Sequence, residues 1–357
     1  MPTDERFEQD LPFMNQKSQC ILTLTDGRAG HETQTKGLCT ILNADQEYRV
    51  EQVKVKTISK FKNSILKWGY NYFSKEWMLG QLIDLNQFED IDIDDIRYIV
   101  SAGGDTLLAN AVLKSYLNSL DIPVQNVIAT SLRRMCENAY DIVFTIDANK
   151  EGQTPYIYYP IAPNKMLSFN LLEEEQESRK KLSLSHTQGV WTILIGASTA
   201  EVEIGSVEDW ILLIEDLIKQ YPADEFYVST SRRTPKAFEQ SLKNVLKQYS
   251  NLHLVLVGDG DKTSIKDLMF AANIIMSSPD STSMVSEGLM LQKPLFVVQF
   301  PDSRMNEEFR QYYEDKIKRG WLQFYSEKDF NISSLNDFKY VNHARELYKI
   351  FHKKNNL

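Results

Sequence analysis

Short apolar segments of strand length alternate with segments of helical spacing along almost the whole chain. In the first half, the strand-like segments are 19–25, 48–55, 96–100, 124–130 and 141–145. In the second half, they are 189–196, 225–229, 253–257, 273–276 and 295–299. Such alternation is typical of parallel sheets whose strands are joined by helical crossovers. The sequence therefore predicts an α/β protein.

The chain has 357 residues, more than one hydrophobic core usually serves. We therefore predict two Rossmann-like α/β domains that face each other across a central cleft, with a single closed barrel as the alternative. The segment 171–184 is rich in Glu and Lys and lacks apolar periodicity, which favours a linker or an exposed helix. The expected parts are an N-terminal arm (1–18), a first domain (19–168), a linker (169–188), a second domain (189–335) and a C-terminal helix (336–357) that packs back on the first domain.

Charge and cysteine usage exclude several classes of protein. The net charge is −9, so the molecule has no cationic field that would gather nucleic acid. The cysteines Cys20, Cys39 and Cys136 are far apart and form no CxxC pair, which argues against a disulfide framework and a zinc site. The N-terminal residues are acidic and polar, unlike a secretion signal, and no apolar run is long enough to span a bilayer. We expect a cytoplasmic protein.

The segment 58–85 is aromatic and basic, and we expect it to form a helix. Phe61, Ile65, Trp68 and Tyr72 fall near one helical face. This pattern fits an amphipathic helix packed on its own domain, and it also fits a helix that lies on a membrane surface or an acceptor. Both interpretations stay open.

A polar turn after one of the late strands is the strongest local signal for a ligand. Residues 278–288 read SPDSTSMVSEG and lead directly into a helix, whose N-terminus is a ready site for a phosphate. Asp280, Ser281 and Ser283 could contact that phosphate or act only as helix caps. Glu287 lies about one turn into the helix, where its carboxylate could accept hydrogen bonds from a ribose diol.

A second cluster follows another strand of the same half. Ser231, Arg232, Arg233 and Thr234 precede a helix, and arginine guanidinium groups match phosphate oxygens. A solvated surface loop is the alternative. The turn at Gly196 is expected to complete the wall of the same pocket.

In the first half, the segment DGRAGHETQ stands where the first strand meets its helix. It is not a GxGxxG motif, so we expect no NAD site. His31 lies near the helix start and could take a proton near neutral pH, or could be structural. Residues 101–106, SAGGDT, resemble a kinase-type GGDGT turn only in part, and Gly103 and Gly104 are interpreted as a close backbone approach at the cleft.

Together, DGRAGHExQ, SRRTP and DSxSMVSEG followed by Lys293 and Pro294 resemble motifs of the ELM1-like family. That family contains plant mitochondrial-fission factors and bacterial proteins regarded as glycosyltransferases, some from lipooligosaccharide outer-core loci. The resemblance implies a GT-B-like architecture, with acceptor and catalytic base in the first domain and the nucleotide-sugar in the second. This sequence departs from the family pattern at 101–106, where a basic residue after the glycine is expected. The residues that the resemblance carries over are Asp26, Gly27, Arg28, Gly30, His31, Glu32, Gln34, Ser231, Arg232, Arg233, Thr234, Pro235, Asp280, Ser281, Ser283 and Glu287.

The hypothesis that follows is a glycosyltransferase of cell-surface polysaccharide or lipopolysaccharide biosynthesis. His31, or Asp26 as second choice, would take a proton from a hydroxyl of a glycan or lipid-linked glycan acceptor, with inversion at the sugar. The helix start at 281–283 and Arg232 or Arg233 would hold the leaving phosphate. We find no convincing DxD pair and expect neither metal nor cofactor. Peripheral contact with the inner membrane is possible, and the oligomeric state is left open. The alternatives are a nucleotide-sugar epimerase and a non-catalytic adaptor of the ELM1 type.

Overall fold

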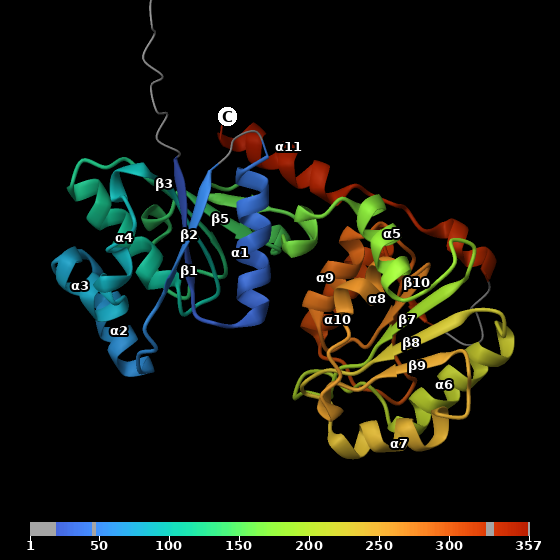
Figure 1. The fold of residues 1–357 in the computed structure, drawn as a ribbon. Coiled ribbons are helices and arrows are strands. Elements are labelled where there is room, and N and C mark those ends of the chain that lie inside the picture. The colour runs from blue at the N-terminus through green and yellow to red at the C-terminus, as the bar shows by residue number, and fades with distance from the viewer. Residues whose placement is uncertain (1–18, 45–47, 326–331, 356–357) are drawn as a thin grey trace, which may run out of the picture.

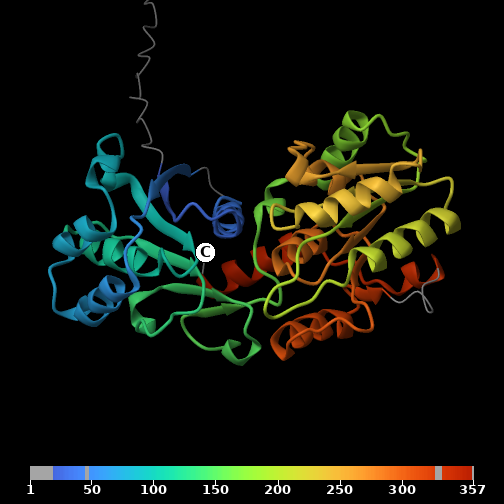
Figure 2. The same ribbon diagram turned by 90° about the horizontal axis from the view of Figure 1, so that it is seen from below.

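The structure is a computed structural model that describes residues 19–44, 48–325 and 332–355. The expected N-terminal arm at 1–18 lies outside the described residues. Within them, two separate parallel sheets form, each with helices on both faces (Figure 1). The prediction of two Rossmann-like α/β domains is therefore confirmed, and the closed barrel is wrong. Seen from below, the domains lie side by side (Figure 2).

The first sheet has the strand order β2-β1-β3-β4-β5-β6, with every pair parallel. All side chains of β1 are buried, as expected for a central parallel strand covered on both faces. The strands are β1 (Cys20–Thr25), β2 (Arg49–Lys54), β3 (Ile96–Ala102), β4 (Gln125–Ala129), β5 (Ile142–Thr145) and β6 (Tyr156–Tyr158). The helices are α1 (Ala29–Leu42), α2 (Lys60–Trp68), α3 (Lys75–Leu82) and α4 (Leu107–Ser119).

The second sheet has the order β12-β11-β10-β7-β8-β9, again with parallel pairs only. Its strands are β7 (Val190–Leu194), β8 (Glu225–Ser229), β9 (Leu252–Val255), β10 (Ile274–Ser277), β11 (Leu295–Val298) and β12 (Gln323–Tyr325). Its helices are α6 (Val207–Gln220), α7 (Lys236–Leu246), α8 (Ile265–Ala271), α9 (Thr282–Met290) and α10 (Glu307–Lys318). Both sheets direct the carboxyl ends of their strands toward loops that precede helices, which is where open α/β sheets bind ligands.

The segment that we expected to be a linker contains a helix, α5 (Leu171–Lys181), that lies against α8 of the second domain. Leu171 packs on the hydrophobic core, but many of the helix's other contacts are polar, which explains why apolar periodicity does not reveal them. The Arg179 side chain is buried and donates hydrogen bonds to the carbonyls of Ser185 and Gln188 and to Asn273. Lys266 of α8 forms an ion pair with Glu174 at 2.7 Å.

The chain returns to the first domain through the last helix, α11 (His343–Asn355). The ring of Phe351 stacks on Phe144 of β5, with 6.2 Å between the centroids. Nδ1 of His343 lies 2.7 Å from the hydroxyl of Tyr159, just beyond β6. The chain therefore crosses between the two domains twice.

The expectation of one helix over 58–85 is wrong. The segment forms α2, a short 3-10 turn at Gly69–Asn71, and α3 after a break in which Ser74 caps the new helix. At this break, the ring of Phe73 lies where a Cβ on Gly69 would stand. None of the helices in the described parts of the chain is long and apolar enough to cross a membrane.

Candidate active site between the domains

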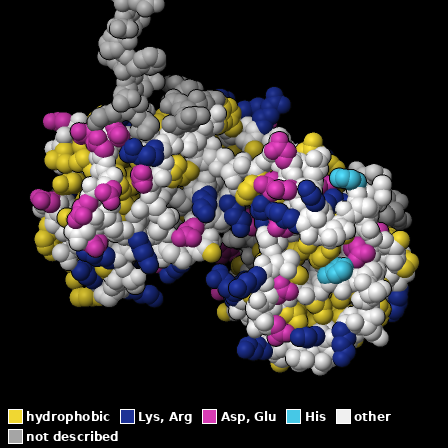
Figure 3. Space-filling view, in the orientation of Figure 1, with side chains coloured by type: hydrophobic (Ala, Val, Ile, Leu, Met, Phe, Trp, Pro, Cys, Tyr) yellow, Lys and Arg dark blue, Asp and Glu magenta, His cyan; other side chains and the backbone are white. Residues whose placement is uncertain are grey.

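The surface is hollowed between the two domains (Figure 3). Residues that line this cleft follow strands of both sheets. At its base, the starts of α1 and α9 meet, because a Cβ built on Gly30 would lie 3.9 Å from Oγ of Ser283. A cavity of about 60 Å³ lies beside this contact. This volume holds a few water molecules. The cavity is lined by Thr33, Gln34, Ile146, Ala162, Pro163, Asn164, Thr282, Ser283, Ser286 and Tyr312.

In the first domain, His31 and Asp26 form a hydrogen-bonded pair. Nδ1 of His31 lies 2.7 Å from Oδ2 of Asp26, whose side chain is almost fully buried. The other oxygen, Oδ1, accepts a hydrogen bond from the Arg28 backbone N–H at 3.1 Å. A carboxylate held in this way fixes the orientation and tautomer of the imidazole. It leaves Nε2 as the ring nitrogen that can take a proton from a ligand.

Neighbouring side chains leave no room for a Cβ at the two glycines after β3. Gly103 has a φ of +88°, and a Cβ there would lie 2.2 Å from Nδ1 of His31. A Cβ on Gly104 would lie 2.2 Å from a guanidinium nitrogen of Arg133. The close approach expected at these glycines is therefore present, and its partners are His31 and Arg133.

Sequence reasoning did not identify Arg133, which follows β4. It supplies a guanidinium beside Gly104, in the loop where the resemblance led us to expect a basic residue. The available signal was the Arg133–Arg134 pair shortly after a buried strand, in an acidic chain.

The remaining residues of the α1 loop hold one another in place. Arg28 forms an ion pair with Asp105 at 2.8 Å. Glu32 accepts a hydrogen bond from the Thr25 hydroxyl at 2.9 Å. Gly27 has a φ of +78°, which favours glycine at this sharp turn. Gln34 lines the cavity between the domains.

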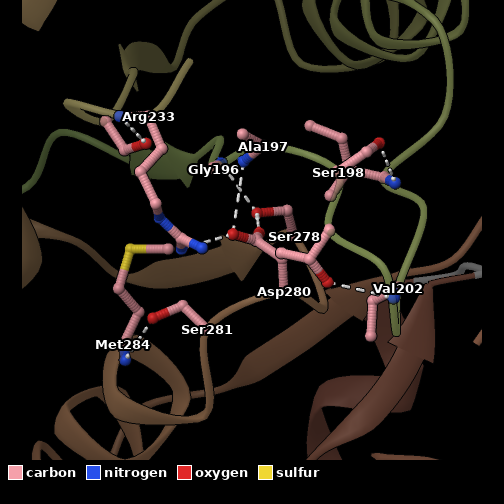
Figure 4. A network of polar contacts seen from close by, with 12 residues as sticks. Gly196, Ala197, Ser198, Val202, Arg233, Ser278, Asp280, Ser281 and Met284 are labelled. Carbon is pink, nitrogen blue, oxygen red and sulfur yellow. Dashed lines mark hydrogen bonds and ion pairs between the residues drawn. The ribbon is translucent and has the colours of Figure 1, made fainter. Parts of the chain in front are cut away.

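In the second domain, Asp280 joins three loops (Figure 4). Its side chain is fully buried and accepts hydrogen bonds from the Ser278 hydroxyl at 2.6 Å and the Ala197 N–H at 3.2 Å. Arg233 contributes an ion pair at 2.6 Å. A Cβ on Gly196 would lie 2.2 Å from either carboxylate oxygen. Asp280 and Gly196 therefore organise the loops after β7, β8 and β10.

The loop 231–235 is held mostly by its own hydroxyl groups. The Thr234 hydroxyl donates to the carbonyl of Gly196 at 2.7 Å and accepts a hydrogen bond from the Ser231 N–H at 2.9 Å. Arg233 is engaged by Asp280, whereas Arg232 is exposed and has no hydrogen bond or ion pair with any residue that the structure describes. Arg232 is therefore the cation of this loop without a partner among the described residues.

Helix α9 begins at the cleft. The Ser281 hydroxyl caps it by accepting a hydrogen bond from the Met284 N–H at 3.3 Å. Thr282 and Ser283 face the cavity between the domains. Ser281 thus has the capping role that the sequence left open, while the helix N-terminus is directed at the first domain.

Glu287 of α9 contacts the first domain. Its Oε1 accepts a hydrogen bond from the Thr33 hydroxyl at 3.1 Å and lies 3.6 Å from Nζ of Lys165. Burial raises the pKa of the Glu287 carboxyl, and the charge of Lys165 partly offsets this effect. The side chain that we expected at a ribose diol therefore holds the two domains together in this structure.

The described residues contain no candidate metal centre. Within residues 19–44, 48–325 and 332–355, no three His, Cys, Asp or Glu side chains are grouped so that they could hold an ion.

Comparison with known protein families gives one match over most of the chain. The sequence model of the mitochondrial fission ELM1 family matches residues 29–347. An uncharacterized protein of Rickettsia prowazekii is 23% identical over 174 residues, which are 46% of this chain and 46% of that relative. Less than half of the relative's length is therefore matched.

Solved structures share the two-domain architecture. The UDP-GlcNAc 2-epimerase of Neisseria meningitidis, bound to UDP-GlcNAc, superposes with a TM-score of 0.52 and 12% identity, covering 95% of this chain and 92% of that one. ADP-heptose lps heptosyltransferase II of E. coli gives a TM-score of 0.46 and 11% identity, covering 94% and 100%. At such identities a likeness shows the fold alone, which is GT-B-like.

Proposed function

The chain belongs to the mitochondrial fission ELM1 family, and on this premise we propose that it is a glycosyltransferase that uses a nucleotide-sugar donor. The observation that carries the proposal is the Asp26–His31 pair, with 2.7 Å between Oδ2 and Nδ1, on the first domain's side of the cleft. The start of α9 and the free guanidinium of Arg232 belong to the second domain. A general base and an anion site on separate domains suit a transfer between two substrates.

In the proposed reaction, Nε2 of His31 removes the proton from an acceptor hydroxyl. The hydroxyl oxygen then attacks the anomeric carbon, and the bond from that carbon to the phosphate oxygen breaks. The nucleotide leaves with the bonding electrons, and the configuration at the anomeric carbon inverts. Asp26 stabilises the imidazolium that forms.

The leaving phosphate gains negative charge as the bond breaks. The N-terminal end of α9 and Arg232 would stabilise it, since free N–H groups at a helix start and a guanidinium both favour anions. We propose that these groups take the place of a metal ion. The acceptor would be a glycan or a lipid-linked glycan, at the cytoplasmic face of the inner membrane, in the synthesis of a cell-surface polysaccharide or lipopolysaccharide.

The test traces the sugar of the donor. Nucleotide-sugars labelled in the sugar are incubated with the protein and a lipid and glycan extract, and the label is traced by chromatography. We expect the label to move to an acceptor, with one free nucleotide released for each sugar transferred. The change His31→Ala should slow this transfer by about 10²- to 10⁴-fold. The matched control is His253→Ala, because His253 also pairs with a carboxylate, that of Glu225 at 2.7 Å, but lies on edge strand β9.

Two other results would contradict the proposal. Conversion of the donor to a nucleotide-sugar with an altered sugar, without acceptor, would indicate an epimerase. If the label stays in the unaltered donor for every nucleotide-sugar tested, the result would indicate a non-catalytic adaptor.

A further inference from the structure

The first domain exposes a group of large apolar side chains on α2, α3 and the turn between them, which we call the α2–α3 surface. The exposed fractions are 77% for Phe61, 42% for Ile65, 73% for Trp68, 77% for Tyr72 and 52% for Trp77. Aromatic side chains of this size are usually buried, and a contiguous exposed group of them marks an interaction site.

The orientation of α2 explains this exposure. Phe61, Ile65 and Trp68 follow a spacing of four and three residues, so they lie on one side of the helix. Among the residues of α2, only Leu66 is fully buried. The helix therefore presents its aromatic side away from the core. The Trp68 and Tyr72 rings, 5.7 Å apart, extend that side across the turn.

The same segment is basic within an acidic chain. Residues 56–82 contain five lysines and one glutamate, a net charge of five minus one, or +4, whereas the whole chain carries −9. Lys60 and Lys62, which flank Phe61 in the chain, are exposed, and Nζ of Lys62 donates to the side chain of Gln81 at 2.9 Å. A surface that is aromatic and cationic at once is complementary to the boundary of an anionic bilayer, where Trp and Tyr sit among headgroups.

We propose that the α2–α3 surface docks on a membrane that contains anionic lipid, with Trp68 and Tyr72 in the headgroup region and the lysines over the lipid charges. The protein would lie on the membrane without crossing it. This inference goes beyond the proposed function and does not depend on it.

The surface connects to the cleft through a short series of contacts. Nζ of Lys67 donates to the carbonyl of Arg133 at 3.4 Å, and the guanidinium of Arg133 lies against Gly104. The neighbouring Gly103 lies against the ring of His31. In Figure 1, α2 and the loop before α1 lie on the same lower side of the first domain. A docked molecule would hold the His31 loop near the bilayer, which suits a lipid-linked acceptor.

The test is sedimentation with vesicles, without any sugar donor. The full chain is mixed with vesicles of phosphatidylcholine alone or with added phosphatidylglycerol. Binding should be at least about tenfold stronger with the anionic lipid and should weaken at high salt. The double variants Trp68→Ser/Tyr72→Ser and Lys60→Glu/Lys62→Glu should each lose most of this binding.

Matched variants of the second domain and of α5 control for general effects. Leu172 and Leu212 are 66% and 60% exposed, and Leu172→Ser/Leu212→Ser should bind vesicles as the wild type does. The same holds for Lys219→Glu/Lys247→Glu, which makes the same charge change on the other domain. Circular dichroism of each variant would check that it is folded. Equal binding of the wild type to both vesicles, or to neither, would overturn the proposal. So would a dimer of the wild type that Trp68→Ser/Tyr72→Ser dissociates, because the surface would then serve a second copy.

Discussion

Oε1 of Glu287 lies 3.1 Å from the hydroxyl oxygen of Thr33, and this hydrogen bond joins helix α9 of one domain to helix α1 of the other. Lys165 adds a positive charge 3.6 Å from the same oxygen. A ribose that used Glu287 would have to replace Thr33. Donor binding at Glu287 and separation of the two domains are therefore expected to be coupled.

Replacement of Glu287 by Gln should change how stability depends on pH. Burial raises the pKa of this carboxyl above its ordinary value of 4.5. The folded protein therefore holds this proton more tightly than the unfolded chain, so stability from this group is present below pH 4.5 and is lost as the pH rises through the folded pKa. Glu287→Gln should show a smaller decline over that range in urea unfolding at several pH values, because the amide does not titrate. The exposed control Glu177→Gln should follow the wild type, and an identical curve for Glu287→Gln would contradict the account.

The Asp26–His31 pair should be essential for transfer and unimportant for donor binding. His31→Ala should lower kcat by about 10²- to 10⁴-fold, the usual contribution of a general base. Asp26→Asn should lower it in the same direction, because the amide no longer fixes the tautomer. Donor affinity should change little, since the pair lies on the other domain. A matching loss of donor affinity in both variants would instead assign the pair to binding.

Gly103→Ala should reduce activity through its contact with His31. The new Cβ would meet Nδ1 of His31 at 2.2 Å, so the imidazole has to move away from Asp26. Gly152→Ala is the matched control, because Gly152 also has a positive φ, of +75°, but a Cβ there has open space around it. Both changes carry the same kind of backbone strain. Only Gly103→Ala should lower kcat strongly; equal losses would show that backbone strain is the cause.

His343 should make the protein sensitive to acid. Burial lowers the pKa of His343 to about 4 from 6.5, although the charge of Glu346 opposes the effect. Stability from the neutral, buried ring is present above pH 6.5 and is lost as the pH falls through the folded pKa, in total about 3 kcal/mol. His343→Asn should flatten this part of the stability curve in urea unfolding. The exposed control His186→Asn should keep the wild-type slope, and a steep curve in His343→Asn would argue against the assignment.

The architecture could be predicted from the sequence because central parallel strands are buried on both faces. Segments such as 189–196 and 295–299 therefore appear as continuous apolar runs between helix-length segments. The break after Trp68 could not be predicted in the same way, because the apolar spacing continues across it to Tyr72. Helix α5 joins the second domain through Arg179 and ion pairs, which leave no apolar period.

The candidate site could be predicted only as a set of loops. The sequence places Asp280, Thr234 and Arg232 after strands, but it does not show that the first two satisfy buried groups while the third stays free. Arg133 and Lys165 reach the cleft from segments far away in the chain. Their contribution depends on tertiary contacts, which local motifs do not encode.

The two arginines of the 231–235 loop allow the donor site to be tested directly. Arg232 is free, whereas Arg233 pairs with the fully buried Asp280 at 2.6 Å. Arg232→Ala should keep the wild-type melting temperature without ligand and lose donor binding. Arg233→Ala should also lower the stability, by about 1–3 kcal/mol, because a buried carboxylate loses a partner.

The measurement is therefore a thermal-shift panel of UDP, CMP, GDP and ADP with their common sugars, on the wild type and these two variants. Our account predicts that one nucleotide raises the melting temperature of the wild type and has no effect on Arg232→Ala. If no nucleotide shifts the wild type even at millimolar concentration, the protein has no donor site and is not a glycosyltransferase.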